Sequence, residues 1–171
     1  NYMAFAVSAG AVIKTVTSTI DTGFALPPVE KFEELITERT KAILICNPNN
    51  PTGYLYSRAE MNQIRDLVMK YDLYLFSDEV YREFCYDDKF GVPTMAHFRD
   101  IDENLVIIDS VSKRFSACGA RVGCVVTRNK ELQAALLKFC QSRLSVATID
   151  QIGAAALYDV DHEFFRSCKA E

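Results

Sequence analysis

Three short apolar runs alternate along this chain with segments of helical periodicity. The runs Ala42 to Cys46, Tyr74 to Phe76 and Leu105 to Ile108 lack strict apolar–polar alternation, which is typical of strands covered on both faces. The first two begin about thirty residues apart, as a strand–helix–strand crossover requires, so we expect parallel pairing. Val122 to Thr127 follows the third run too closely for a crossover helix and is expected to be antiparallel. The pattern predicts an α/β fold with a mostly parallel mixed sheet flanked by helices.

The clearest helical pattern lies between the first two runs. Ser57 and Glu60 have the spacing of a capping box, and the apolar residues that follow recur on one helical face, so the sequence predicts a helix over 58–71. Asn129 is the expected N-cap of a second helix that includes Leu132 to Phe139. Weaker patterns predict a strand over Val12 to Ser18 and helices around Phe32 to Ile36, over 149–158 and over 162–169.

Composition agrees with this predicted fold and argues against nucleic-acid and membrane partners. With 171 residues, of which 49% are apolar and 25% charged, the chain is expected to form one globular domain with a buried core. A net charge of −4 argues against a nucleic-acid partner, because phosphate binding needs clustered basic residues. The sequence has neither an apolar run long enough to cross a bilayer nor a recognisable signal peptide, so we expect no membrane partner and a cytoplasmic location.

The cysteines and histidines do not predict a metal site. No C-x-x-C pair occurs, and several of the six cysteines lie in apolar stretches, so we expect reduced thiols that serve as small core residues. His97 and His162 are far apart and lack metal-ligand spacing with any cysteine. We expect no metal ion.

Each apolar run ends in polar, turn-forming or reactive residues. These are Asn47 to Gly53, Ser77 to Tyr81 and Ser110 to Lys113. In open α/β sheets the ligand lies outside the carboxyl ends of the strands. The topology therefore gathers one set of polar side chains along one rim: Asn50, Asp78, Tyr81, Ser110 and Lys113.

Lys113 and Arg121 have the chemistry needed to hold a phosphorylated aldehyde. A lysine forms a Schiff base only as the neutral amine, which burial and neighbouring positive charge favour. Arg121 supplies that charge and a planar fork of donors suited to a phosphate. An ordinary surface lysine is the alternative. The S-x-x-K pattern of penicillin-binding enzymes also fits Ser110 to Lys113, but no K-T-G or S-D-N motif follows.

The segment from Ser110 to Gly123 resembles the pyridoxal-phosphate attachment site of class I and II aminotransferases, the aspartate aminotransferase-like, fold-type I family. The segment Asn47 to Gly53 is similar to the N-P-x-N-P-T-G turn of the same family. The resemblance implies pyridoxal 5'-phosphate as the cofactor. It implies that Lys113 forms the Schiff base and moves a proton as general acid and base, while Ser110 and Arg121 bind the phosphate.

The resemblance also assigns three residues to the cofactor ring. Asn50 would donate a hydrogen bond to the ring hydroxyl oxygen, and Tyr81 would donate to the same oxygen. Asp78 would pair with the pyridinium nitrogen, since a fixed carboxylate favours the protonated ring. Structural alternatives remain open: a rigid turn around Asn50, an acid at a helix start for Asp78 and an exposed helix tyrosine for Tyr81.

The resemblance extends over essentially the whole chain but covers only the central portion of the family's cofactor-binding large domain. It implies that a phosphate-binding loop, a ring-stacking aromatic residue, a substrate-binding arginine and the small domain lie outside residues 1–171. The chain alone is therefore expected to be inactive, and the parent enzyme is expected to be a homodimer. Ala120 departs from the bulkier residue of many relatives, which leaves substrate choice open.

The implied reaction is transfer of an amino group from an amino acid to a 2-oxo acid. Aspartate or another dicarboxylic amino acid is the expected donor. Two alternatives share these residues: a carbon–sulfur lyase of the same fold, and a regulator that retains an aminotransferase-like domain as a ligand sensor.

Overall fold

The computed structural model describes residues 2–86, 91 and 93–170. The chain divides into two compact units, residues 1–40 and residues 41–171, where composition alone predicts one domain. Within the described residues, no helix is both long enough and apolar enough to cross a membrane.

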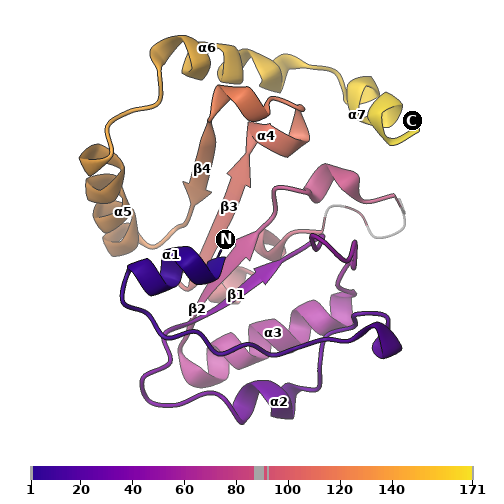
Figure 1. The fold of residues 1–171 in the computed structure, drawn as a ribbon, viewed down its shortest axis with the longest axis vertical. Helices are drawn as coiled ribbons and strands as arrows, with labels where there is room; N and C mark the ends of the chain where they lie inside the picture. Colours follow the sequence, from indigo (N-terminus) through magenta and orange to yellow (C-terminus); the bar gives the residue numbers. More distant parts are fainter. Residues whose placement is uncertain (1, 87–90, 92, 171) are drawn as a thin grey trace. The chain divides into compact units, whose positions relative to one another are not determined.

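The first unit consists of short helices joined by extended backbone (Figure 1). Its helices are α1 (Tyr2–Ser8), η1 (Ile20–Thr22) and α2 (Val29–Glu33). The predicted strand over Val12 to Ser18 is wrong: these residues form neither helix nor strand, and Val12 is 78% exposed. Strand propensity expresses packing against neighbouring strands, and this segment pairs with none in the described structure. Helix α2 contains Phe32 but ends before Leu35 and Ile36, which lie in the following turn.

The second unit is built on a four-stranded sheet of order β1-β2-β3-β4. Strands β1 (Ala42–Cys46), β2 (Tyr74–Asp78) and β3 (Leu105–Ser110) pair in parallel, and β4 (Gly123–Val126) pairs with β3 in the antiparallel sense. The predicted α/β class with a mixed, mostly parallel sheet is confirmed. Because the three parallel strands run the same way, their carboxyl ends meet at one edge.

The crossover helix α3 (Arg58–Tyr71) begins and ends as the sequence predicts. Ser57 Oγ accepts from the Glu60 N–H, and the Glu60 carboxylate accepts from the Ser57 N–H, so the capping box is complete. Its apolar face is buried through Met61, Ile64, Leu67 and Val68. The helix connects β1 to β2, which pair in parallel (Figure 1).

Short helices follow β2 and β3, and longer ones follow β4. The short ones are η2 (Arg82–Phe84), η4 (Met95–His97), η5 (Arg99–Ile101), α4 (Val111–Arg114) and η6 (Cys118–Ala120). The later ones are α5 (Lys130–Ser142), α6 (Thr148–Ala156), η7 (Leu157–Asp159) and α7 (His162–Ala170). Asn129 caps α5 as expected, since its side chain accepts from the Leu132 N–H at 2.9 Å.

Phe115 anchors the end of α4 in a small aromatic core. It lies with Val111 and Ala154 in one buried cluster, and its ring centre is 5.5 Å from that of Phe165 and 6.5 Å from that of Phe164. Residues from α6 and α7 thus hold the helix that follows β3.

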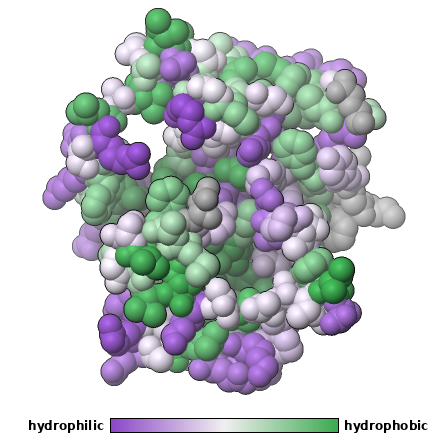
Figure 2. Space-filling view, viewed as in Figure 1, coloured by the Kyte–Doolittle hydropathy of each residue, from purple (hydrophilic) through white to green (hydrophobic). Residues whose placement is uncertain are grey.

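The expectation that the cysteines serve as core residues is correct for only two of them. All six are free thiols, but only Cys46 and Cys85 are buried. Cys124 lies on β4, of which every residue is exposed, and Cys140 lies on α5, which has no buried residue. Apolar side chains are visible at the surface (Figure 2), and Val126, Leu137 and Phe139 are exposed. An apolar neighbourhood in sequence therefore does not imply burial here.

Candidate active site

The turn after β1 presents Asn50 at the sheet edge. Asn47 is buried and accepts a hydrogen bond from the Tyr56 N–H at 3.0 Å, which ties the start of the turn to its exit. Asn49 closes the loop, because its carbonyl accepts from the Gly53 N–H at 2.8 Å and its side chain accepts from Thr52 Oγ1 at 2.8 Å. Gly53 has a φ of 69°, which favours glycine. Asn50 is left at the exposed tip.

Asp78 and Tyr81 occupy the end of β2 and the turn beyond it. Asp78 is the last residue of β2, is buried, and is in register with Cys46 on one side and Ile108 on the other. Its Oδ1 accepts from the Val80 N–H at 3.2 Å, which shapes the turn. Tyr81 then reaches back towards the first turn, where its hydroxyl accepts a hydrogen bond of 2.5 Å from Asn50 Nδ2.

Lys113 lies in the last turn of α4, directly beyond β3. Ser110 starts this helix by accepting from the Ser112 N–H at 3.0 Å, as an N-cap does. The half-buried Lys113 places its Nζ 5.9 Å from the centre of the Tyr81 ring. Asn50, Tyr81 and Lys113, which come from the ends of three different strands, therefore form one continuous group.

Ser110 and Arg121 make hydrogen bonds to neighbouring parts of their own segment. Ser110 Oγ is 2.8 Å from Ser112 Oγ and 2.9 Å from the Val122 carbonyl oxygen. Arg121 is exposed, has a φ of 54° and donates to the Cys118 carbonyl oxygen at 2.8 Å. Gly123 lies opposite Ser110, and a Cβ at this position would lie only 3.1 Å from the Asp109 carbonyl oxygen, so glycine favours the close approach of β4 to β3.

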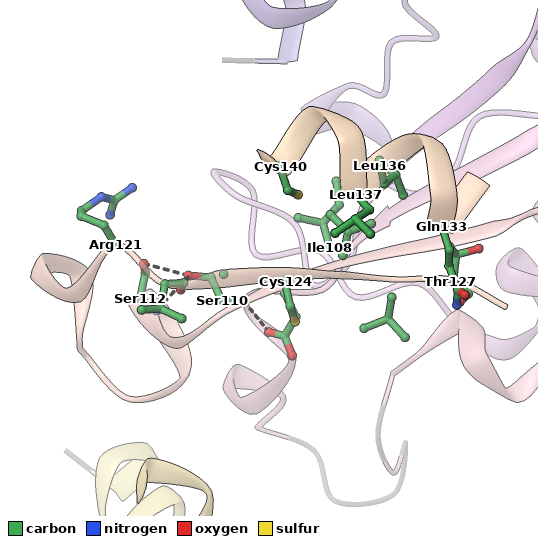
Figure 3. A pocket seen from close by; sticks show the side chains of 15 residues that line it. Ile108, Ser110, Ser112, Arg121, Cys124, Thr127, Gln133, Leu136, Leu137 and Cys140 are labelled. Carbon is green, nitrogen blue, oxygen red and sulfur yellow. Dashed lines mark hydrogen bonds between the residues drawn. The ribbon is translucent and has the colours of Figure 1, made fainter. Parts of the chain in front are cut away.

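A hollow of about 660 Å³ lies between α5 and the β3–β4 pair (Figure 3). Leu136, Leu137 and Cys140 project into it from the helix. Of the described residues that line it, only Ser110 and Arg121 belong to the predicted site. The structure thus brings Asn50, Tyr81 and Lys113 together by direct contacts, and it brings Ser110 and Arg121 to the wall of one hollow.

Beneath this edge lies an ionic network that sequence reasoning missed. Asp109 Oδ2 lies 2.8 Å from Arg82 Nη2 and 3.0 Å from Arg114 Nη2. Arg82 Nη1 also lies 3.5 Å from Glu79 Oε2, and Arg114 Nε lies 3.3 Å from Glu83 Oε1. The only sequence signal was charged residues at buried strand ends, where unpaired charge is costly.

Burial is the largest influence on the pKa of Asp109 and of Glu79, the two most enclosed carboxyls of this network. It raises the pKa of Asp109, against the opposing effects of the Ser110 N–H, which donates to Oδ1 at 2.8 Å, and of Arg82. Burial likewise raises the pKa of Glu79, while the Met95 N–H lowers it by donating to Oε1 at 2.9 Å. These contacts hold the Glu79 carboxylate against Met95 and Arg82.

The chain is similar in sequence and in fold to known proteins. The model of the family "aminotransferase class I and II" matches residues 2–167. An aspartate aminotransferase of Bacillus subtilis is 34% identical over 137 residues, covering 80% of this chain and 34% of that protein. The crystal structure of aspartate aminotransferase from Thermotoga maritima superposes with a TM-score of 0.86 at 30% identity, covering 96% of this chain and 43% of the other.

A second solved structure agrees with the first. N-succinyldiaminopimelate aminotransferase from Mycobacterium tuberculosis superposes with a TM-score of 0.84 at 28% identity and covers 96% of this chain and 43% of that one. The chain therefore spans less than half the length of these relatives. The family match over residues 2–167, together with these superpositions, establishes that this chain belongs to the class I and II aminotransferases.

Proposed function

We propose that this chain is the central portion of the cofactor-binding large domain of an enzyme that transfers an amino group from an amino acid to a 2-oxo acid. Family membership supports the reaction class. The relatives named aspartate aminotransferase support aspartate or another dicarboxylic amino acid as the donor. Because the chain covers only 43% of the Thermotoga protein, activity belongs to a complete enzyme, which we propose to be a homodimer.

The side chains present fit pyridoxal 5'-phosphate, the cofactor that the family implies. The observation that carries the proposal is the group Asn50, Tyr81 and Lys113, which places an amide donor, a phenol and an amine side by side at the strand ends. Asp78 adds a carboxylate at the end of the central β2 strand. These residues offer an amine for the aldehyde, a carboxylate for the ring nitrogen, and hydroxyl and guanidinium donors for the phosphate.

Each side chain would act through its own chemistry. Lys113 would hold the cofactor covalently, and Asp78 would keep a proton on the ring nitrogen. Asn50 and Tyr81 would donate to the ring hydroxyl oxygen. Ser110 and Arg121 would bind the phosphate, for which a guanidinium fork is suited. When bound, the cofactor supplies an electron sink for the substrate α carbon.

Lys113 would also move the proton of the reaction. An amine released near the substrate can take the α proton as a general base and return it as a general acid. Its place in a four-residue helix, capped by Ser110 and anchored by Phe115, supports this role because the amine has a defined direction.

Reductive trapping tests the proposal. Borohydride treatment of the complete enzyme with pyridoxal phosphate should attach the cofactor to Lys113, as read by peptide mass spectrometry, and aspartate should yield its 2-oxo acid in a half-reaction. The control is Lys113→Ala, which should lose both signals. Labelling of the exposed Lys41 or Lys130 in place of Lys113 would overturn the assignment.

A further inference from the structure

The buried ionic network follows the predicted site residue by residue. Four of its members are the sequence neighbours of four site residues, and the pairs are Glu79 with Asp78, Arg82 with Tyr81, Asp109 with Ser110, and Arg114 with Lys113. Successive strand residues point to opposite faces, so Asp109 and Ser110 project to different sides of β3. The network is thus a layer of charged side chains that the backbone joins directly to four site residues.

Asp109 is the centre of that layer. Its Oδ2 lies within 3.0 Å of both Arg82 and Arg114, while its Oδ1 accepts from the Ser110 N–H. One carboxylate therefore joins the turn after β2, the end of β3 and the helix α4. Of the ion pairs in the described residues, those of Asp109 are among the most enclosed, with 9% of the Asp109 side chain, 10% of that of Arg114 and 20% of that of Arg82 exposed.

Because these ion pairs are enclosed, the positions of their side chains are restricted. A buried charge that loses its partner is strongly destabilising. Moving any of the three side chains away from the others therefore costs free energy, and this cost keeps them together. Helix α4 has only four residues, and so short a helix does not hold its own direction. Its direction is set by the Ser110 cap, by Val111 and Phe115 in the core, and by the Arg114 pair next to Lys113.

We propose that Asp109 is a positioning residue that, through Arg82 and Arg114, holds Lys113 against Tyr81. Arg82 is adjacent to Tyr81 and Arg114 is adjacent to Lys113, so a single carboxylate sets the spacing of the two groups that face each other at 5.9 Å. The inference rests on the proposed function only for the reaction of Lys113 with an aldehyde.

The test compares Asp109→Asn with Asp102→Asn in the 171-residue chain. Asp102 is a matched control, because its carboxylate also pairs with two arginines, Arg99 at 3.6 Å and Arg128 at 3.3 Å, and neither arginine is a sequence neighbour of Tyr81 or Lys113. Each variant is mixed with excess pyridoxal phosphate and reduced with borohydride over time. Peptide mass spectrometry gives the labelling rate of Lys113 relative to that of Lys130 in the same molecule.

We expect Asp109→Asn to lower this ratio by about tenfold or more, as a misplaced reacting group does, and Asp102→Asn to leave it unchanged. Reactions run at the same interval below each variant's melting temperature, so that a change of stability alone does not alter the ratio. Arg114→Lys keeps a positive charge beside Asp109 without the forked geometry and should restore part of the ratio relative to Arg114→Gln. It also serves as the test if Asp109→Asn does not fold.

Two results would overturn the inference: an unchanged Lys113 ratio in Asp109→Asn and in Arg114→Gln, or an equal fall in Asp102→Asn. Preferential labelling of Lys130 over Lys113 in the unaltered chain would instead count against the proposed function, so the two failures are distinguishable.

Discussion

Asn50 and Tyr81 are joined by a 2.5 Å hydrogen bond from Asn50 Nδ2 to the Tyr81 hydroxyl oxygen, although 31 residues separate them in sequence. They come from the turns after two adjacent parallel strands, β1 and β2. Because the Tyr81 hydroxyl accepts this bond, its own proton remains available for donation to a ligand. The second N–H of the Asn50 amide is not used by this bond either, so the pair retains two donors.

The two side chains should be energetically coupled. In a double-mutant cycle, Asn50→Ala and Tyr81→Phe should be non-additive in the free energy of unfolding by about 0.5–1.5 kcal/mol, the net value of a hydrogen bond. Urea unfolding of the 171-residue chain measures this. Asn50→Ala with Tyr54→Phe is the matched control, because Tyr54 bonds Glu60 at 2.8 Å instead. Additivity in the Asn50–Tyr81 cycle would refute the coupling.

Asp78→Ala should separate turnover from cofactor retention. In the complete enzyme we expect turnover to fall about a hundredfold or more, because the fixed charge at the ring nitrogen is lost, while the phosphate contacts still hold the cofactor. Steady-state kinetics and cofactor absorbance give the two quantities. Asp78→Asn, which keeps the shape without the charge, should behave similarly. An equal loss of both quantities would indicate a structural role.

Arg121→Ala should affect cofactor retention more than turnover. We expect it to weaken retention by about tenfold or more, since a hydrogen bond from a charged group contributes about 1.5–3 kcal/mol. Retention is measured by equilibrium dialysis of the complete enzyme. The exposed Arg128, which pairs with Asp102, provides the control variant Arg128→Ala. Retention that is unchanged by Arg121→Ala would count against a phosphate role.

The capping box should contribute measurably to the second unit. Ser57→Ala removes the acceptor for the Glu60 N–H and should lower the free energy of unfolding by about 1 kcal/mol. Ser57→Asp retains an acceptor at the N-cap and should recover most of the loss. Urea titration of both variants checks this; a neutral Ser57→Ala would show that the helix start is held by packing alone.

The 171-residue chain by itself should be catalytically silent. It covers 43% of the Thermotoga relative, and transamination needs a substrate-carboxylate clamp and a closed, water-poor site. Incubation with aspartate, 2-oxoglutarate and cofactor should yield no 2-oxo acid product above a Lys113→Ala control. Product above that control would mean that the missing parts are dispensable.

Local sequence determined most elements of the second unit. The capping box at Ser57 and the Asn129 cap follow from hydrogen bonds within one helix start. The β1–β4 strands follow from apolar runs, and the antiparallel direction of β4 follows from the short connection after β3. The convergence of Asn50, Tyr81 and Lys113 was also predictable, since parallel strands end at one edge.

Only the tertiary structure decided which side chains are covered and which charges meet. Val12 to Ser18 has strand composition but no partner strand in the described residues, and Cys124 and Cys140 lie on faces that nothing in the described structure buries. The pairing of Asp109 with Arg82 and Arg114 joins segments 27 and five residues apart. Burial and ion pairing depend on how separate elements pack in space, so no periodic pattern within one element encodes them.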